Sequence, residues 1–251
     1  MIKKEEFTFD SRDGQTGLCA VRWIPEGKII GILQIVHGMA EYVERYDEFA
    51  RYMAKKGILV TGEDHLGHGK SVVEGGTYGY FCKQDPATVV VRDVHRLKKM
   101  TQEEYPGIPY VILGHSMGSF MLRNYLCRYG TGIQGAIICG SGHMPVPAIV
   151  CAGAATKLLK LFRGDGSVSK LLDKVAFGSY NNRIPNPNTD YDWLSSDETV
   201  VQKYMKDPYC GFKFTINGFE TLFELLKRAH TVENMRKIPK NLPLLILAGE
   251  E

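Results

Sequence analysis

Ser116 is the residue whose surroundings point most directly to covalent chemistry. It lies in a Gly-x-Ser-x-Gly motif at 114–118, which follows an apolar run at 110–113 and precedes a helix-forming run. A strand, a tight turn and a helix in this order push a serine Oγ clear of the sheet. Gly114 and Gly118 are needed because larger side chains would collide across so tight a turn. The pattern predicts that Ser116 is a nucleophile.

Two further polar loops come directly after predicted strands. Residues 37–41 (His-Gly-Met-Ala-Glu) follow a buried strand predicted over 29–36. Residues 63–71 follow a short strand predicted over 58–62. Catalytic groups of a parallel sheet gather outside the carboxyl ends of its strands. We therefore expect both loops to lie beside the serine turn.

The elements that must position these loops alternate along the chain. Residues 5–10 alternate apolar and polar side chains, which predicts a strand, and a turn at 12–14 leads to a second strand predicted over 18–24. The two strands form an opening antiparallel hairpin in this prediction. From residue 29 to 140 the order is strand, helix, strand, helix, strand, helix, strand. This order predicts an α/β fold with a mostly parallel, doubly wound sheet and the hairpin at its edge.

The alternation stops after Gly142, which suggests an insertion. An apolar stretch, a basic stretch and a polar aromatic stretch follow, before the apolar run 244–249. We predict that residues 1–142 form the first part of the core and 143–230 a helical cap. Residues 231–251 are predicted to return to the core.

Composition limits the classes of partner. The net charge of +3 is too small to indicate nucleic-acid binding, although it permits weak attraction to an anionic membrane surface. Residues 144–162 of the predicted cap are apolar with basic residues toward their end, so they either line an acyl pocket, contact such a surface or simply pack on the sheet. Six cysteines without a framework spacing, and no apolar leader after Met1, predict a cytoplasmic protein.

Taken together, the motifs resemble those of α/β-hydrolases of the lysophospholipase and monoacylglycerol lipase type, which are sometimes grouped with serine aminopeptidase-like hydrolases. The resemblance rests on residues 37–41 with Arg45-Tyr46, on Asp64-x-x-Gly67-His68-Gly69-x-Ser71, on 114–118 and on the stretch 192–212. It implies the α/β-hydrolase fold, with Ser116 as nucleophile and the backbone N–H groups of Met39 and Met117 as the oxyanion hole. It also implies a small acyl-ester or lipid substrate and no cofactor.

The same resemblance implies that an acid and then a histidine follow the serine along the chain. The acid is expected just after the strand predicted over 244–248, and the histidine later still, whereas the sequence ends at Glu251. We therefore expect this chain to be truncated and nearly inactive. The strand at 244–248 is then expected to have an unpaired edge that favours dimerisation.

Several alternatives stay open at this point. His143 is a candidate substitute for the base and Glu251 for the acid. Asp64 and His68 suggest a metal ligand pair, but such a site needs more ligands than the sequence offers, so we predict no metal. Because fold does not fix substrate, a peptidase or thioesterase remains an alternative to the ester hydrolase. A non-catalytic acyl-binding protein is the alternative from another class.

Overall fold

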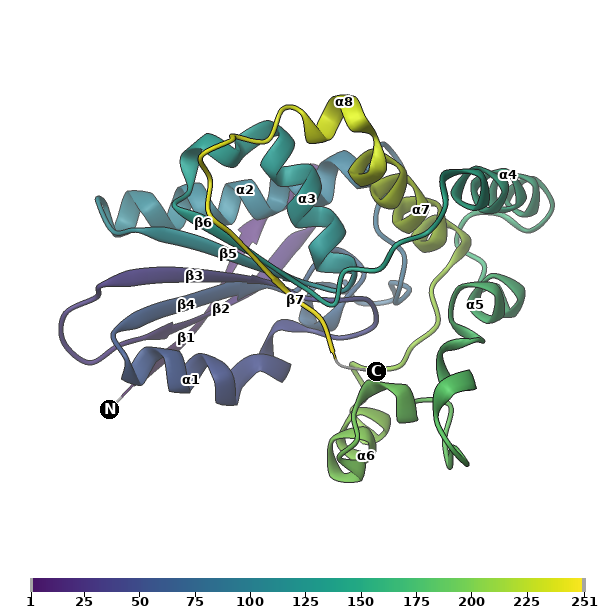
Figure 1. The fold of residues 1–251 in the computed structure, drawn as a ribbon, viewed down its shortest axis with the longest axis horizontal. Helices are drawn as coiled ribbons and strands as arrows, with labels where there is room; N and C mark the ends of the chain where they lie inside the picture. The colour runs from purple at the N-terminus through teal and green to yellow at the C-terminus, as the bar shows by residue number, and fades with distance from the viewer. Residues whose placement is uncertain (1, 250–251) are drawn as a thin grey trace.

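One sheet of seven strands carries the fold in the computed structural model, which describes residues 2–249 (Figure 1). The strands are β1 Lys3–Asp10, β2 Gly17–Ile24, β3 Gly31–Val36, β4 Ile58–Glu63, β5 Tyr110–His115, β6 Gly135–Cys139 and β7 Leu244–Leu247. Their order across the sheet is β1-β2-β4-β3-β5-β6-β7. β1 and β2 pair antiparallel with each other, β2 pairs antiparallel with β4, and the other pairs are parallel. The predicted α/β fold with an antiparallel edge is confirmed.

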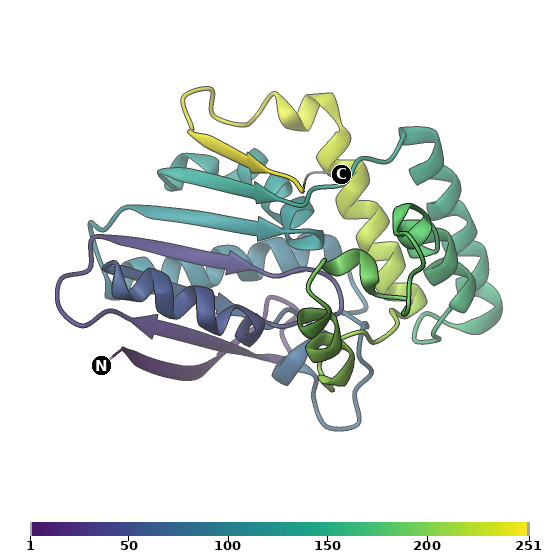
Figure 2. The ribbon, with the colours of Figure 1, turned by 60° about the horizontal axis from the view of Figure 1, so that its bottom comes forward.

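Helices cover both faces of this sheet. Those of the core are η1 Val43–Tyr46, α1 Asp47–Lys55, η2 Gly69–Ser71, α2 Pro86–Glu104, α3 Met117–Tyr129 and η3 Gly130–Gly132. α2 and α3 lie on one face and α1 on the other (Figure 2). All six residues of β3 are buried, because the strand stands in the middle of the sheet with helices on both sides. Its Ile- and Val-rich sequence is what such a position requires.

The insertion after β6 lies over the carboxyl ends of the parallel strands (Figure 2). It contains α4 Val146–Arg163, α5 Lys170–Phe177, η4 Tyr180–Arg183, η5 Asp192–Leu194, α6 Glu198–Lys206 and α7 Ile216–His230, and α8 Val232–Met235 follows it. Ser169, Asp197 and Thr215 accept backbone N–H bonds at the starts of α5, α6 and α7. α7 packs against both α4 and the core helix α3. The division into 1–142, 143–230 and 231–251 stays a prediction.

β7 has an unusual environment for an apolar strand. Within the described residues it pairs with β6 only, at the edge of the sheet. Its four side chains, Leu-Leu-Ile-Leu, are between 44% and 70% exposed. An open, apolar strand edge is a template for pairing with another chain.

Two findings bear on where the protein resides. All six cysteines are free thiols. Within residues 2–249, no helix has both the length and the apolar character that crossing a bilayer requires. The cytoplasmic location stays a prediction.

Candidate active site

Ser116 occupies a strained turn between β5 and α3. Its φ of 51° and ψ of −119° lie where side chains other than glycine are rarely found, and such strain is concentrated at functional sites. The backbone holds the turn: Ser116 N donates to Cys139 O at 3.0 Å, and Ser119 N donates to Ser116 O at 2.9 Å. A Cβ at Gly118 would overlap the carbonyl oxygen of Val36, so the glycine is what lets α3 approach β3.

The loop after β3 reaches the same place as the serine turn. Met39 and Ser116 both line a cavity of about 490 Å³ beneath the cap. Met117 is buried as the first residue of α3, where backbone N–H groups have no acceptor within the helix. The structure therefore brings Ser116 and Met39 into one cavity, and Met117 directly follows Ser116 in the chain. Their roles as nucleophile and oxyanion hole stay predictions.

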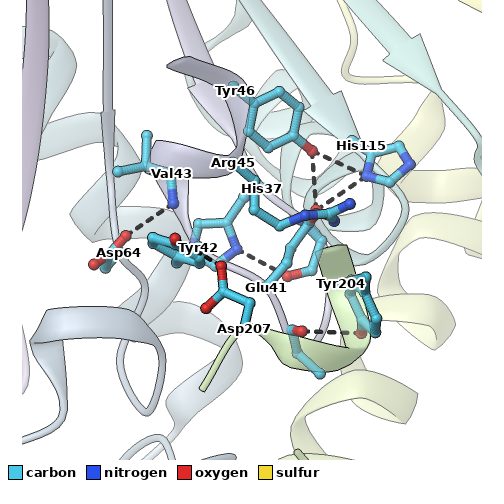
Figure 3. A network of polar contacts seen from close by, with 12 residues as sticks. His37, Glu41, Tyr42, Val43, Arg45, Tyr46, Asp64, His115, Tyr204 and Asp207 are labelled. Carbon is cyan, nitrogen blue, oxygen red and sulfur yellow. Dashed lines mark hydrogen bonds and ion pairs between the residues drawn. The ribbon is translucent and has the colours of Figure 1, made fainter. Parts of the chain in front are cut away.

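A buried carboxylate, Glu41, ties this loop to the serine turn (Figure 3). Its Oε1 accepts the Gly38 N–H and, at 2.9 Å, the Tyr46 hydroxyl, and lies 3.1 Å from His115 Nδ1. Its Oε2 pairs with Arg45. Two of these partners are sequence neighbours of the residues of interest: Gly38 directly precedes Met39, and His115 directly precedes Ser116. One carboxylate therefore fixes both strands' terminal loops relative to each other.

The surroundings of Glu41 favour its ionised, negatively charged form. Burial by itself raises the pKa of this carboxyl, but the hydrogen bond and charge of His115, the charge of Arg45 and the Gly38 N–H outweigh it. Together they lower the pKa from 4.5 to about 2. The sequence analysis named Glu41 only as part of a motif and missed this function. The available signal was a carboxylate placed inside an otherwise apolar loop after a buried strand.

Cap residues hold the same loop from the other side. Ala40 has a φ of 52°, and its carbonyl oxygen accepts the Gly211 N–H and the Tyr204 hydroxyl, each at 3.0 Å. The Tyr42 hydroxyl donates to Asp207 at 2.8 Å (Figure 3). The position of the cap segment 204–211 is therefore coupled directly to the loop that carries Met39.

Three buried histidines support the neighbouring loops. The ring of His37 stacks on His65 with centroids 3.8 Å apart, and His68 packs close to both. Burial, with the charge of His65, lowers the pKa of His37 well below 6.5 and that of His68 to about 3. The imidazoles of His37 and His68 are therefore neutral at physiological pH. His37 makes a local hydrogen bond to the Gly38 carbonyl at 2.8 Å, whereas His115 bonds to Glu41 of the loop after β3 rather than within its own turn.

The Asp64 side chain holds backbone segments together and, among the residues that the structure describes, is not placed as a metal ligand. Its carboxylate accepts the Val43 N–H at 2.9 Å and the Lys70 N–H at 2.8 Å. Burial raises its pKa to about 6 despite these bonds. In the described part of the chain, no three His, Cys, Asp or Glu side chains are placed to hold a metal ion.

None of the seven imidazoles is hydrogen-bonded to Ser116 Oγ in the described structure. His143, the alternative base, is exposed and its ring lies edge-on to His230 at 5.0 Å. His95 on α2 is half-buried, and its ring stacks on that of Tyr129 with centroids 3.8 Å apart. Glu251, the alternative acid, lies outside the described residues. The serine is therefore placed for chemistry without a base beside it among residues 2–249.

Comparisons with known proteins identify the family of this chain. A family model described as serine aminopeptidase, S33, matches residues 27–251. The chain is 31% identical over 186 residues to a monoacylglycerol lipase of Mycolicibacterium smegmatis, which covers 74% of this chain and 58% of that relative. It is also 30% identical to a monoglyceride lipase of Rattus norvegicus over 241 residues. That alignment covers 94% of this chain and 70% of the relative. The chain thus spans less than two thirds of its mycobacterial relative.

A solved structure shows the same architecture at similar sequence identity. It is a highly thermostable carboxyl esterase from Bacillus coagulans in complex with glycerol. It superposes with a TM-score of 0.88 at 30% identity, covering 97% of this chain and 79% of that one. The relatives and this neighbour are ester hydrolases by name.

We expect Glu41→Gln to destabilise the protein in a pH-dependent way. A pKa lowered from 4.5 to about 2 corresponds to about 3 kcal/mol, at about 1.4 kcal/mol per unit. Because the folded pKa is below the unfolded one, this stabilisation is present above pH 4.5 and is lost as the pH falls toward 2. Urea unfolding of wild type and variant at a series of pH values measures it.

The matched control is Glu44→Gln, on the same turn. Glu44 pairs with Lys4 and Lys70 and is not part of the Glu41 network. We expect this variant to lose well under half as much stability at neutral pH, since its ion pairs are partly exposed. A Glu41→Gln deficit that stays constant from pH 7 to pH 3 would contradict the assignment of the stabilisation to the carboxylate charge.

Proposed function

Because the chain belongs to the serine aminopeptidase (S33) family of hydrolases, we propose that its cavity takes acyl esters, with monoacylglycerols or lysophospholipids as the substrate class. The observation that carries this proposal is the strained Ser116 sharing one cavity with Met39. Aromatic side chains from the cap line the rest of that cavity and suit an acyl chain: Phe177, Tyr180, Tyr191, Trp193, Tyr204 and Phe212.

In the proposed reaction Ser116 Oγ attacks the ester carbonyl carbon. The carbonyl oxygen becomes an oxyanion, which the backbone N–H groups of Met39 and Met117 stabilise. A single preset donor of this kind contributes about 3 kcal/mol to the transition state. The alcohol leaves with a proton, and water then releases the acid from the acyl-serine. Backbone donors explain why methionine is compatible with both positions.

We also propose that residues 1–251 by themselves catalyse ester hydrolysis poorly. A serine needs an adjacent base to become a nucleophile at neutral pH. Each imidazole in the described structure is engaged elsewhere, as with His115 on Glu41 and His143 against His230. This same observation favours non-catalytic acyl binding as the second candidate function. Peptidase and thioesterase activity on the same fold are not favoured by any contact in the cavity.

We expect the 251-residue chain to bind a medium-chain fatty acid but to hydrolyse p-nitrophenyl butyrate at close to the background rate. Ser116→Ala is expected to change neither the fatty-acid affinity nor the hydrolysis rate. Ser195→Ala, which removes a hydroxyl from the cap, is the control variant and is expected to behave in the same way. Binding is followed by the fluorescence of Trp193, which lines the cavity. Turnover at a serine-esterase rate that Ser116→Ala abolishes would show that a base is present. Absence of fatty-acid binding would contradict the acyl cavity itself.

We also propose that the cap contacts anionic membrane surfaces transiently. Leu161 and Phe162 on α4 are 82% and 81% exposed, and Leu171 and Val175 on α5 are also exposed. Basic side chains accompany the apolar ones of α4: Lys157, Lys160 and Arg163. Apolar groups that insert at a headgroup boundary, flanked by cations, are typical of interfacial helices.

Vesicle co-sedimentation tests this contact. Leu161→Asp/Phe162→Asp is expected to weaken binding to vesicles of phosphatidylglycerol and phosphatidylcholine by about tenfold or more, since each buried side chain contributes about 1.5–3 kcal/mol. Tyr52→Asp, an exposed aromatic on α1, is the control and is expected to bind as wild type. Equal binding by all three proteins would exclude the cap as the contact surface.

Dimerisation through β7 is the last part of the proposal. It is supported by the exposed apolar strand that pairs on one side only within the described sheet. Ile246 is 70% exposed, and Ile246→Lys places a charge on this edge. Light scattering after size-exclusion chromatography is expected to show a dimer for wild type and a monomer for the variant. A wild-type monomer at high micromolar concentration would rule the dimer out.

A further inference from the structure

The helix α5 presents a charged face to the cavity that holds Ser116. Lys170, Asp173, Lys174 and Phe177 line this cavity at helical spacings of three and four residues. Leu171 and Val175 lie on the other, exposed side of the same helix. A third face, with Leu172, is buried in the core. The helix therefore covers the core with one side and adds three charged side chains and Phe177 to the wall of the cavity.

The carboxylates of the cavity already have a cation. Lys213, from the segment before α7, pairs with Asp173 at 2.9 Å. The hydrogen bond and charge of Asp173, with a smaller effect from Asp190, raise the pKa of Lys213. Asp173 is therefore paired, and Asp190 lies close enough to affect the same lysine. Together the three lysines and two carboxylates that line the cavity give it a net charge of +1.

The two remaining cations have no such partner. Among the described residues, neither Lys170 nor Lys174 forms an ion pair. Because they stand four residues apart on one helix, their Cβ atoms are about 5–6 Å apart, so both ammonium groups can reach one anion. The wall of the cavity therefore offers two adjacent, unpaired positive charges to whatever occupies it.

From this charge distribution we infer that the substrate carries a phosphate group on its alcohol half, held by Lys170 and Lys174. The inference rests on the proposed function and narrows its substrate class from monoacylglycerols or lysophospholipids to acyl esters of glycerol phosphate. A neutral head group would leave both ammonium groups without a counter-charge, whereas a phosphate accepts charge-assisted hydrogen bonds from each. The acyl chain would occupy the aromatic part of the same cavity, where Tyr180 and Trp193 meet edge to face at 4.7 Å.

A pair of short-chain ligands tests this with binding as the readout, so the result does not depend on turnover. The pair is 1-hexanoylglycerol 3-phosphate and 1-hexanoylglycerol, both used as monomers in solution. The chain has two tryptophans. Trp23, on β2, is fully buried, whereas Trp193 lines the cavity, so a ligand-dependent fluorescence change reports on the cavity. We expect the phosphorylated ligand to bind about tenfold more tightly at low ionic strength, with a smaller advantage at high salt.

Variants assign the effect to the two lysines. Lys170→Gln/Lys174→Gln is expected to remove the tenfold preference while leaving the affinity for 1-hexanoylglycerol unchanged. Lys170→Arg/Lys174→Arg is expected to keep the preference, and a normal unfolding temperature of both double variants shows that the fold is intact. The matched control is Lys157→Gln, an exposed lysine of α4 that does not line this cavity. We expect it to behave as wild type.

The outcomes separate this inference from the function on which it rests. If the neutral ligand binds as tightly as the phosphorylated one, the phosphate inference is overturned while the acyl-ester proposal stands. The inference also fails if Lys157→Gln reduces the preference as much as the double variant, because the effect is then general surface charge. If neither ligand changes Trp193 fluorescence, the proposed acyl-ester function itself is contradicted.

Discussion

A carboxylate that is removed from water must collect its own hydrogen-bond donors, and Glu41 shows how much structure this requires. Its donors come from the backbone of its own loop at Gly38, from the start of the following helix at Arg45 and Tyr46, and from His115 at the end of β5. An uncompensated charge at this depth would cost several kcal/mol. The loop after β3 and the turn after β5 are therefore held together by one buried charge.

The serine turn depends on the same closeness. Ser116 keeps a backbone conformation that is unfavourable for serine, and it does so because the surrounding bonds leave no alternative. Gly118 removes the side chain that would separate α3 from β3, and Ser119 bonds back to the Ser116 carbonyl. Strain at the serine is thus compensated by packing of the central strands, the most buried part of the sheet.

The cap adds a second constraint and most of the chemical character of the cavity. It bonds to Ala40, directly beside Met39, so a movement of the segment 204–211 would also move the loop of the proposed oxyanion hole. It also supplies aromatic rings and a charged helix face to the cavity. The carboxyl esterase from Bacillus coagulans shares this fold. The charges of the cavity come from the cap of this chain.

The sequence by itself determined the fold class, the order of the strands' connections and the serine turn. These depend on local patterns: apolar runs of strand length, glycines where the backbone has a positive φ or approaches closely, and alternation of strands with helices. Only the tertiary structure decided what surrounds Glu41, since His115 is 74 residues away in the chain. It also decided that Lys213 pairs with Asp173, while Lys170 and Lys174 form no ion pair with any residue between 2 and 249. Such pairings arise from the packing of distant segments, and no local pattern of residues records them.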